Sequence, residues 1–421
     1  EADRQAIDRR VAELLQQPLG ADEAVQLALL NNRGLQAAFF ELGVAEADLV
    51  QAGRLPNPGF SFGRSARGDE REIERSLHLG LGKLLAMPWL RELEQRRFAR
   101  TQAMAAQQVL TLAAEVRQAW VQAVAAVEHV RYAGQVVQAA EAGAELARRM
   151  ARAGNFNALQ QAREQAFRAD AALAQARAQQ QVLATRERLT RLLGLWGGQA
   201  AFRLPERLPE LPAVPRELPE VERLAIAQRL DVQGARLAVQ QTAADLGLTR
   251  STRFVNVLEL GLSRNGSNEA PTQRGWEIGF ELPLFDFGQA RVARAESVYR
   301  QALERAADTA IQARSEVREA YGAYRTAWDI ARYQRGEVLP LRARIAEENL
   351  LRYNGMLIGV FELLADARAQ IAGVNAAIEA LRDFWLAQAE LDRALVGKPG
   401  ASAVPVATPA AAAAAGGGDP H

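Results

Sequence analysis

The sequence contains no cysteine, only three histidines and no long apolar run. Without cysteine, the chain has no disulfide, no thiolate nucleophile and no cysteine-ligated metal. Histidine occurs only at His78, His129 and His421, which poorly supplies a metal centre or a catalytic triad. No run of about 18 apolar residues is present, so no helix is expected to cross a membrane. We therefore expect no enzyme, no catalytic residue, no cofactor and no metal site.

The charge of the chain is nearly balanced. Its 51 basic and 50 acidic residues leave a formal net charge of +1. Such a balance provides no strong field for nucleic acid, so no nucleic-acid partner is expected. The opening residues EADRQAIDRR lack the apolar core of a signal peptide. We expect either a cytosolic protein or a mature one whose signal has been removed.

The most informative feature of the sequence is an internal repeat. Residues 24–49 match residues 221–246 at an offset of 197. Matches at an offset of 201 follow further along, namely EVRQAW at 115–120 with EVREAY at 316–321, and Gly154 with Gly355. A near-constant offset over most of the chain predicts a tandem duplication. Chance similarity between alanine-rich helices is the alternative.

Each copy is predicted to contain a helix, a β-hairpin, a very long helix, a turn and a last helix. The first copy covers 21–197, with a hairpin near 58–84 and a long helix near 88–153 that begins at Pro88. The second copy covers 219–397, with a hairpin near 253–283 and a long helix near 289–353. An N-terminal segment (1–20) precedes the first copy, and a proline-rich connector (198–218) joins the two copies. The chain ends in a low-complexity tail (398–421) that we expect to be disordered.

The predicted strands alternate between apolar and polar residues. In the last strand, Trp276, Ile278 and Phe280 alternate with glutamates and glycine. Alternation of this kind gives a strand two different faces. Faces that carry Phe60, Phe62 and aromatic residues such as Trp276 suit a lipid-facing band. A soluble β-sandwich element packed on the helices is the alternative.

The long helices and short hairpins both require partners. A helix of about 65 residues extends about 100 Å, and its apolar residues have coiled-coil spacing, at Leu112, Val116, Ala119, Ala123, Val127 and Val130. Two-stranded hairpins are marginal in water and have open edges. Four strands per chain do not close a pore, but three chains would supply 12 strands. We therefore predict a trimer.

With these features, the chain resembles the TolC-like outer-membrane efflux family over about residues 20–396. The resemblance is carried by the duplication, by LPLFDFG at 282–288, and by the turns RAG at 152–154 and RYNG at 352–355. The junction LLAMPW at 84–89 departs from the family pattern. The resemblance implies a mainly α protein with a membrane β-barrel, in which the trimer forms a 12-stranded barrel and a long α-helical barrel.

The resemblance also implies a function. It predicts an outer-membrane channel subunit of a tripartite efflux system in a Gram-negative bacterium, extending into the periplasm. The expected partners are two further copies of the chain, outer-membrane lipid, a periplasmic adaptor protein and an inner-membrane transporter that drives export. A duct for type I protein secretion and a soluble coiled-coil scaffold are the alternatives. Family members often begin with a lipidated cysteine, so this N-terminus is expected to be trimmed or unlipidated.

The candidate functional residues lie at the two helix turns. Gly154 and Gly355 are predicted to end helices in the left-handed conformation. With Asn155 and Asn354 they would form the periplasmic tips on which the adaptor docks, and simple helix capping is the alternative.

A candidate gate follows the second turn. Family members gate this mouth with aspartates six and nine residues after the second glycine, positions that Phe361 and Leu364 occupy here. The corresponding position after the first glycine is Gln160, so an identical charge latch is not expected. Phe361 and Leu364 would form an apolar constriction, or Glu362 and Asp366 a displaced acidic ring. Ordinary exposed or packed helix residues are the alternative.

Overall fold

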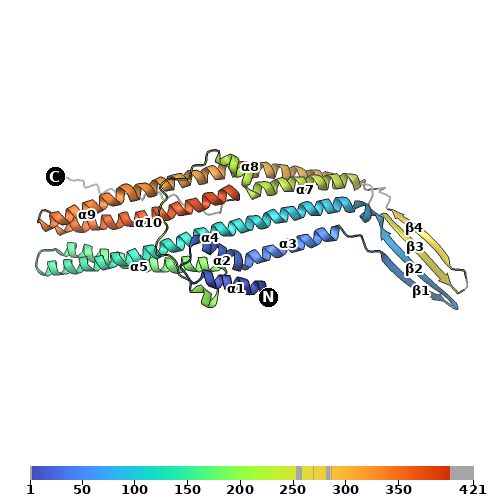
Figure 1. Ribbon diagram of the computed structural model, residues 1–421, viewed down its shortest axis with the longest axis horizontal. Coiled ribbons are helices and arrows are strands. Elements are labelled where there is room, and N and C mark those ends of the chain that lie inside the picture. Colours follow the sequence, from blue (N-terminus) through green and yellow to red (C-terminus); the bar gives the residue numbers. More distant parts are fainter. Residues whose placement is uncertain (1, 253–257, 269, 281–284, 286, 399–421) are drawn as a thin grey trace. The chain divides into compact units, whose positions relative to one another are not determined.

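The computed structural model describes residues 2–252, 258–268, 270–280, 285 and 287–398. The protein is mainly helical, with one small sheet (Figure 1). It divides into two compact units, of which unit 1 comprises Glu1–Asn32, Leu112–Val221 and Glu316–His421, and unit 2 comprises Arg33–Thr111 and Glu222–Ser315. Both units take residues from both sequence repeats, so the units and the repeats divide the chain differently. Among the described residues, no helix has an apolar stretch long enough to cross a membrane.

Unit 1 contains two antiparallel helical hairpins (Figure 1). The first hairpin is α4 (Leu81–Arg152), from Leu112 onward, with α5 (Ala158–Leu193). The second hairpin is α9 (Leu339–Asn354) with α10 (Val360–Val396). The remaining elements of unit 1 are α1 (Ala2–Leu14), α2 (Ala21–Asn31), the short η1 (Gly197–Ala200), the end of α8 (Gln289–Tyr333) and the π-helical segment η2 (Gln334–Val338).

Seven-residue spacing of small residues explains the close packing of the first hairpin. On α4 the buried alanines at this spacing are Ala119, Ala126, Ala133, Ala140 and Ala147. On α5 the buried positions at the same spacing are Glu164, Ala171, Ala178 and Thr185. This spacing marks the seam of a coiled coil, and alanine lets two helices approach closely. Of the predicted seam residues on α4, three are fully buried, namely Val116, Ala119 and Ala123.

The main core of unit 1 lies where α1, α2, α4 and α5 meet. The indole Nε1 of Trp120 donates to the Leu19 carbonyl oxygen at 2.7 Å, and Asn31 Nδ2 donates to the Gly194 carbonyl oxygen at 2.7 Å. Gly194 ends α5 with φ +68°, and a Cβ there would lie 2.6 Å from the Asn31 carbonyl oxygen. Only glycine satisfies both the backbone conformation and the close approach.

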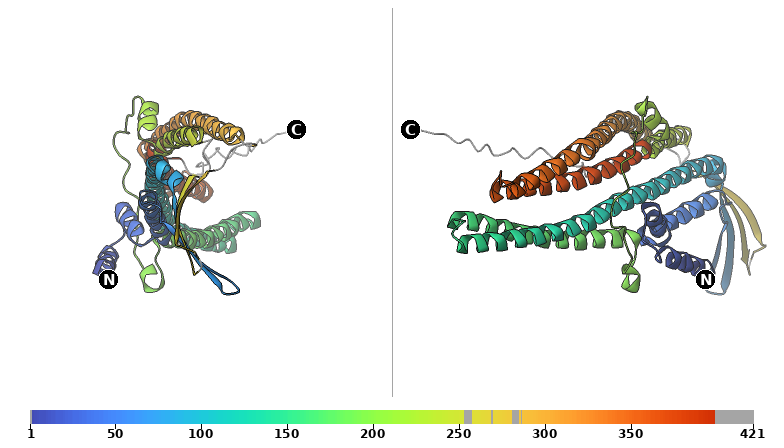
Figure 2. Two further views of the ribbon diagram at one scale, coloured as in Figure 1. Left: turned by 90° about the vertical axis from the view of Figure 1, so that its right-hand side faces the viewer. Right: turned by 60° about the vertical axis from the view of Figure 1, so that its left-hand side comes forward.

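The proline-rich connector runs along unit 1 as an extended segment (Figure 2), and aromatic side chains hold it. Trp328 and Trp385 donate their indole N–H groups to the carbonyl oxygens of Pro212 and Pro209, at 2.9 and 3.1 Å. The backbone N–H of Arg216 donates to the Tyr324 hydroxyl at 2.9 Å. An extended segment has no hydrogen-bond ladder of its own, so these bonds satisfy its backbone groups.

Unit 2 combines helices with the sheet. Its helices are α3 (Arg33–Ala52), the first part of α4, α6 (Val221–Gln228, apart from its first residue), α7 (Leu230–Thr252) and the first part of α8. Arg96 Nη1 donates to the Gln240 carbonyl oxygen at 3.2 Å and so joins α4 to α7. An ion pair between Arg250 and Glu296 joins α7 to α8.

The sheet has four antiparallel strands in the order β1-β2-β3-β4. Their bounds are β1 (Gly59–Arg67), β2 (Glu70–Gly80), β3 (Leu258–Ser267) and β4 (Gln273–Phe280). On one face of the sheet, a cross-strand row is formed by Phe60, Leu77, Leu262 and Trp276. The next row on the same face, two residues nearer the loops, is formed by Phe62, Arg75, Arg264 and Arg274. Residues in one row point to the same face of a sheet.

Some sequence predictions need correction. The prediction that the first long helix begins at Pro88 is wrong, because β2 passes directly into α4 at Leu81. Pro88 lies inside the helix, where its missing N–H removes one hydrogen bond without ending the helix. The helix predicted at the start of each copy is broken, at Asn32 and at Arg229. These breaks lie 197 residues apart, which is the offset of the repeat itself.

A few predictions fall outside the described residues. They concern the ends of the second β-hairpin at 253–257 and 281–283, most of the LPLFDFG segment, and the tail from residue 399.

Candidate functional site

The turn of the first hairpin ends α4 with the predicted left-handed glycine. Gly154 has φ +79°, its N–H donates to the Ala151 carbonyl oxygen, and the Asn155 N–H donates to the Met150 carbonyl oxygen at 2.9 Å. This pair of bonds defines a Schellman motif, with glycine at the residue that must be left-handed. The predicted conformation of Gly154 is therefore confirmed, and both Gly154 and Asn155 are exposed at the turn.

The turn of the second hairpin uses the same motif with a different residue. The Met356 N–H donates to the Tyr353 carbonyl oxygen, and the Leu357 N–H to the Arg352 carbonyl oxygen at 2.9 Å. Met356 takes the left-handed position, with φ +58°, whereas Gly355 has φ −79°. The prediction that Gly355 is left-handed is thus wrong, because the helix continues one residue further than the glycine indicates. Asn354 is the last residue of α9 and is exposed.

An aromatic stack joins the two hairpins near these turns. The rings of Phe156 and Phe361 lie 4.6 Å apart at an interplanar angle of 18°. Phe156 forms a small apolar core with Ala147 and Val360, against which Phe361 and Leu364 pack. Two of the four candidate gate residues are therefore contacts between the hairpins of one chain. We infer that they fix the spacing of the turns.

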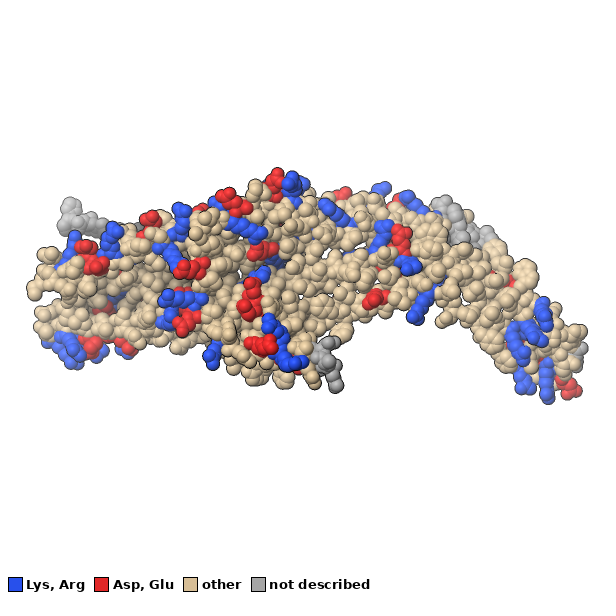
Figure 3. Space-filling view, in the orientation of Figure 1, with Lys and Arg blue, Asp and Glu red and all other residues tan. Residues whose placement is uncertain are grey.

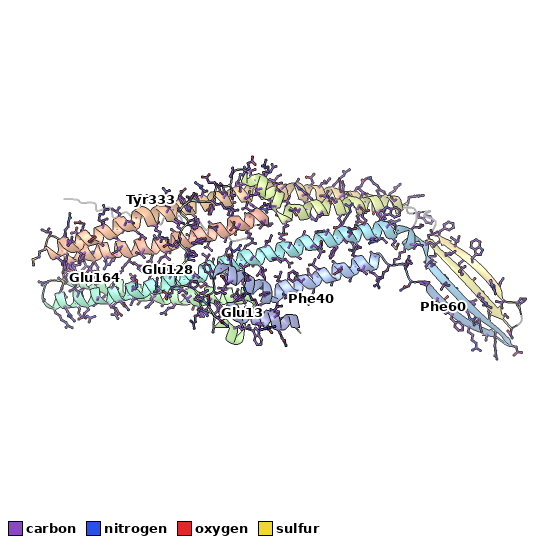
Figure 4. All side chains as sticks on the ribbon, in the orientation of Figure 1. Glu13, Phe40, Phe60, Glu128, Glu164 and Tyr333 are labelled. Carbon is purple, nitrogen blue, oxygen red and sulfur yellow. The ribbon has the colours of Figure 1, made fainter. Side chains whose placement is uncertain are left out.

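A buried ion pair lies beside this stack. Glu164 on α5 is 3% exposed, and Arg368 on α10 donates to its carboxylate at 2.6 Å. Figure 4 labels Glu164, which lies between the two hairpins. The Arg368 guanidinium also lies 4.6 Å from the centre of the Phe167 ring. A charge in such a dry place requires its partner, so the pair ties one hairpin to the other.

The sequence reasoning missed this pair, although a signal was present. Glu164 begins the seven-residue series that continues with Ala171 and Ala178. A carboxylate at a seam position is expected to find a cation on a neighbouring helix. Its partner was not readable, because Arg368 lies in the other repeat.

The remaining gate candidates do not join this cluster. Asp366 accepts a hydrogen bond from the Asn349 amide and so joins α10 to α9. Glu362 is exposed in the first turn of α10, where the helix dipole favours a negative charge. The acidic pair is therefore split between a contact within the second hairpin and an exposed position.

Basic side chains gather on α4 just before its turn. Glu145 accepts bonds from Arg148 at 2.7 Å and from Arg149 at 2.9 Å. The hydrogen bond from Arg149 lowers the pKa of the Glu145 carboxyl below its ordinary value, and the nearby positive charges, which include Arg152, lower it further. The surface near this turn therefore carries excess positive charge, which suits an acidic partner.

The sheet has one polar face. Its strand residues include serines, glycines and four glutamates, at Glu72, Glu74, Glu259 and Glu277. One row places His78 and Glu277 on either side of Gly261, with 3.5 Å between His78 Nδ1 and Glu277 Oε1. A Cβ on Gly261 would lie 2.5 Å from the Glu277 side chain, so the glycine leaves room for this side chain to reach over β3 toward His78 on β2.

The other face of the sheet is apolar and exposed. It carries large side chains at Phe60, Phe62, Leu77, Leu262, Trp276, Ile278 and Phe280. Phe60, labelled in Figure 4, is 68% exposed, and Trp276 is 71% exposed. An apolar band of this kind on one side of a sheet marks a surface that is covered in the working protein. Polar and apolar faces together match the alternation of membrane strands.

A polar groove of about 650 Å³ lies among α4, α5 and α10 in unit 1. Its lining includes His129, Arg177, Glu379 and Arg382. Nowhere in the described part of the chain do three or more potential metal-ligating side chains form a group that could hold an ion.

Paired helical hairpins, a two-faced sheet and a duplicated chain together define the fold of bacterial outer-membrane channels. The Campylobacter jejuni CmeC outer-membrane channel is similar, with a TM-score of 0.75 and 17% identity, over 89% of this chain and 85% of that one. The Neisseria gonorrhoeae MtrE outer-membrane channel is similar, with a TM-score of 0.74 and 19% identity, over 90% and 89% of the two chains. The similarity predicted from the sequence is confirmed at the level of the fold.

Among curated proteins, the chain is similar to the cobalt-zinc-cadmium resistance protein CzcC of Cupriavidus metallidurans. The two are 26% identical over an alignment of 290 residues, and the match covers 66% of this chain and 66% of CzcC. The match thus spans slightly less than two thirds of that relative. No family model matches the sequence.

Proposed function

We propose that this chain is the outer-membrane subunit of a tripartite efflux system and forms a passive export duct across the periplasm. The observation that carries the proposal is the sheet, whose faces separate into an exposed apolar side and a carboxylate-bearing side within the fold of outer-membrane channels. In a membrane barrel, strands alternate apolar toward lipid and polar toward the lumen.

Closure of the sheet supports a trimer. The strands have 9, 11, 10 and 8 residues, which is close to the length that a tilted strand needs to cross a bilayer. β1 and β4 end the strand order of the single chain, so each has an edge to offer. If β4 of one copy pairs with β1 of the next, three copies close a 12-stranded barrel.

The turns of the two hairpins supply the inner mouth of the duct in this proposal. Gly154, Asn155, Asn354 and Gly355 are exposed there and form the docking surface for a periplasmic adaptor protein, which connects to an inner-membrane transporter. Phe361 and Leu364 help to set the width of the mouth, because they hold the second hairpin against the first. Glu362 and Asp366 lie on the same part of α10 and are the alternative acidic gate residues.

Heavy-metal cations are the cargo that we favour. The relative CzcC is named for resistance to cobalt, zinc and cadmium. The polar face of the sheet carries four glutamates, which would line the barrel three times over and favour the passage of cations. Export of a folded or unfolded protein by a type I system remains the competing use of the same duct.

Membrane fractionation followed by reconstitution tests the proposal. We expect the full-length protein in the outer-membrane fraction, extracted only by detergent and migrating as a trimer. In planar bilayers it should conduct ions, and charge-neutral Glu74→Gln and Glu277→Gln variants should lower the preference for cations over anions. A chain that stays soluble without detergent, or that is monomeric in detergent, would overturn the proposal and favour a coiled-coil scaffold.

The cargo is tested in a strain that lacks the gene. Loss of the protein should raise sensitivity to zinc, cobalt and cadmium, and restoring the wild-type chain should reverse it. If metal sensitivity is unchanged while the secretion of a protein stops, the type I alternative is correct.

A further inference from the structure

The apolar face of the sheet also carries five arginines, all exposed and none on the helix side of the middle of its strand. They are Arg64 on β1, Arg71 and Arg75 on β2, Arg264 on β3 and Arg274 on β4. Figure 3 shows basic side chains gathered at this end of the sheet. The strand glutamates Glu72, Glu74, Glu259 and Glu277 all occupy the opposite face. Among the strand residues whose side chains the structure describes, these arginines and glutamates are thus separated across the sheet.

Three of these arginines lie in a single cross-strand row. Arg75 pairs with Arg264, and Arg264 pairs with Arg274. Directly opposed side chains on one face have Cβ atoms about 5 Å apart, and like charges at that distance destabilise a sheet. None of the three is ion-paired with a carboxylate within the portion of the chain that the structure describes. An anion outside the chain that neutralises such a row would therefore stabilise the sheet.

The position of the row indicates what that anion is. The next row toward the helices contains Leu262 and Trp276, so the arginines border the apolar band on its loop side. At the middle of a bilayer an arginine on the lipid face costs about 2–4 kcal/mol, but near the interface the cost falls toward zero. Aromatic side chains likewise collect at the level of the headgroups. Because the apolar band, and not the ends of the strands, sets the depth of a barrel in the bilayer, the row lies at the loop-side border of that band, next to the headgroups of that leaflet.

We propose that Arg75, Arg264 and Arg274, with Arg64 and Arg71 beside them, bind the phosphate groups of an anionic lipid in the outer leaflet. Guanidinium groups match phosphate oxygens with two parallel hydrogen bonds each, and a planar row can hold the two phosphates of one headgroup. This inference rests on the proposed membrane barrel, because the lipid reaches this face only if the sheet spans a bilayer.

Lipid A with both phosphates, and the same lipid after dephosphorylation, are the probes. We expect the detergent-solubilised wild-type trimer to prefer the phosphorylated form in a titration followed by native mass spectrometry. Arg264→Gln should weaken this binding about fivefold, and the triple variant Arg75→Gln/Arg264→Gln/Arg274→Gln on the order of a hundredfold. The control triple Arg294→Gln/Arg300→Gln/Arg305→Gln removes the same charge from exposed positions on α8 and should bind as the wild type does.

A second readout separates binding from a structural role. Without lipid, the sheet triple variant should melt at a higher temperature than the wild type, because the repulsion along the row is gone. With phosphorylated lipid A the order should reverse, because only the wild type gains stability from binding. If the triple variant does not assemble, Arg264→Gln alone carries the test.

Several outcomes would overturn the inference. If the wild type binds both lipid forms equally, or if the sheet triple variant keeps its preference, the lipid site is wrong. Neither result would contradict the proposed membrane barrel. Full competition by inorganic phosphate at the same phosphate concentration would indicate a free-anion site instead of a lipid site. A wild-type chain that is absent from the membrane fraction would overturn the barrel and the lipid site together.

Discussion

The two helical hairpins of unit 1 occupy corresponding positions in the predicted sequence repeat, yet their local structure is defined to different degrees. α5 begins with a capping box, in which Asn157 and Gln160 exchange side-chain and backbone bonds of 2.8 and 2.9 Å. α10 begins at Val360, and the preceding N-cap residue, Gly359, offers no side-chain cap. The first turn places glycine at the left-handed residue, and the second places Met356 there.

The helices that lead into the two hairpins also differ in how regular they are. α4 continues unbroken to Arg152, whereas the path from α8 to α9 passes through the π segment Gln334–Val338, just before Pro340. Proline removes an intrahelical hydrogen bond, and a wider turn relieves its clash with the preceding carbonyl. Local opening is easiest where backbone structure is poorly capped. One hairpin is therefore defined by its own sequence, and the other depends more on contacts with the first.

The largest expected effect comes from breaking the ion pair between the hairpins. Arg368→Ala leaves the Glu164 carboxylate buried without a cation and should destabilise unit 1 by about 3 kcal/mol. The double variant Glu164→Leu/Arg368→Leu should recover most of this loss, because no charge remains buried. Chemical unfolding of the detergent-solubilised protein measures both. Equal losses in the single and double variants would contradict the assigned role of the pair.

Replacement of the turn glycines should separate the two hairpins next. Gly154→Ala forces a Cβ into the left-handed region and should cost about 1–2 kcal/mol. Gly355→Ala should cost much less, because φ is −79° and the nearest atoms to its Cβ would be at 3.5 Å. Thermal melting of the two variants side by side tests this ordering. Equal destabilisation would mean that both glycines need a left-handed backbone.

Capping changes should shift the two hairpins in opposite directions. Asn157→Ala removes the capping box of α5 and should cost about 1 kcal/mol, whereas Gly359→Asn supplies the missing cap of α10 and should gain a few tenths. Hydrogen exchange of the amides in the first turns of α5 and α10 provides the readout. Faster exchange at α5 together with slower exchange at α10 is expected, and no change at α10 would count against the comparison.

The smallest effect concerns pH and is confined to the first hairpin. The hydrogen bond from Arg149 lowers the pKa of the Glu145 carboxyl below its ordinary value of 4.5. The ionised carboxylate therefore stabilises the fold at a pH above 4.5, and this contribution is lost as the pH falls through the lowered pKa. Glu145→Gln should therefore slightly flatten the acid limb of a stability–pH curve below about pH 4.5. An unchanged acid limb would show that the bond does not persist in solution.

Much of this architecture can be predicted from the sequence because it is periodic. The repeat offset, the lengths of the long helices and the alternation in the strands all derive from regular patterns. The details that failed are local exceptions to those patterns. Pro88 predicts a helix start, yet α4 already begins at Leu81. Gly355 predicts a left-handed residue, yet Met356 adopts that conformation.

The contacts between the hairpins were less accessible. The sequence predicts Phe361 and Leu364 as an apolar constriction. Their partner Phe156 lies in the other copy, and nothing in the sequence pairs it with them. Glu164 and Arg368 are likewise unrelated by the repeat. Long-range partners follow from how the helices pack, which one sequence does not contain. The roles of the turn residues as a docking surface and of the gate residues in opening stay predictions.

The tryptophans that hold the backbone of unit 1 provide its own optical reporters. The protein has six tryptophans, and three of them donate their indole N–H to the carbonyls of Leu19, Pro212 and Pro209. Detachment of the connector would expose Trp328 and Trp385 to water and move their fluorescence to longer wavelengths. Trp276 on the sheet should move to shorter wavelengths when lipid covers it. Unlabelled protein would thus report assembly and membrane insertion through its own emission.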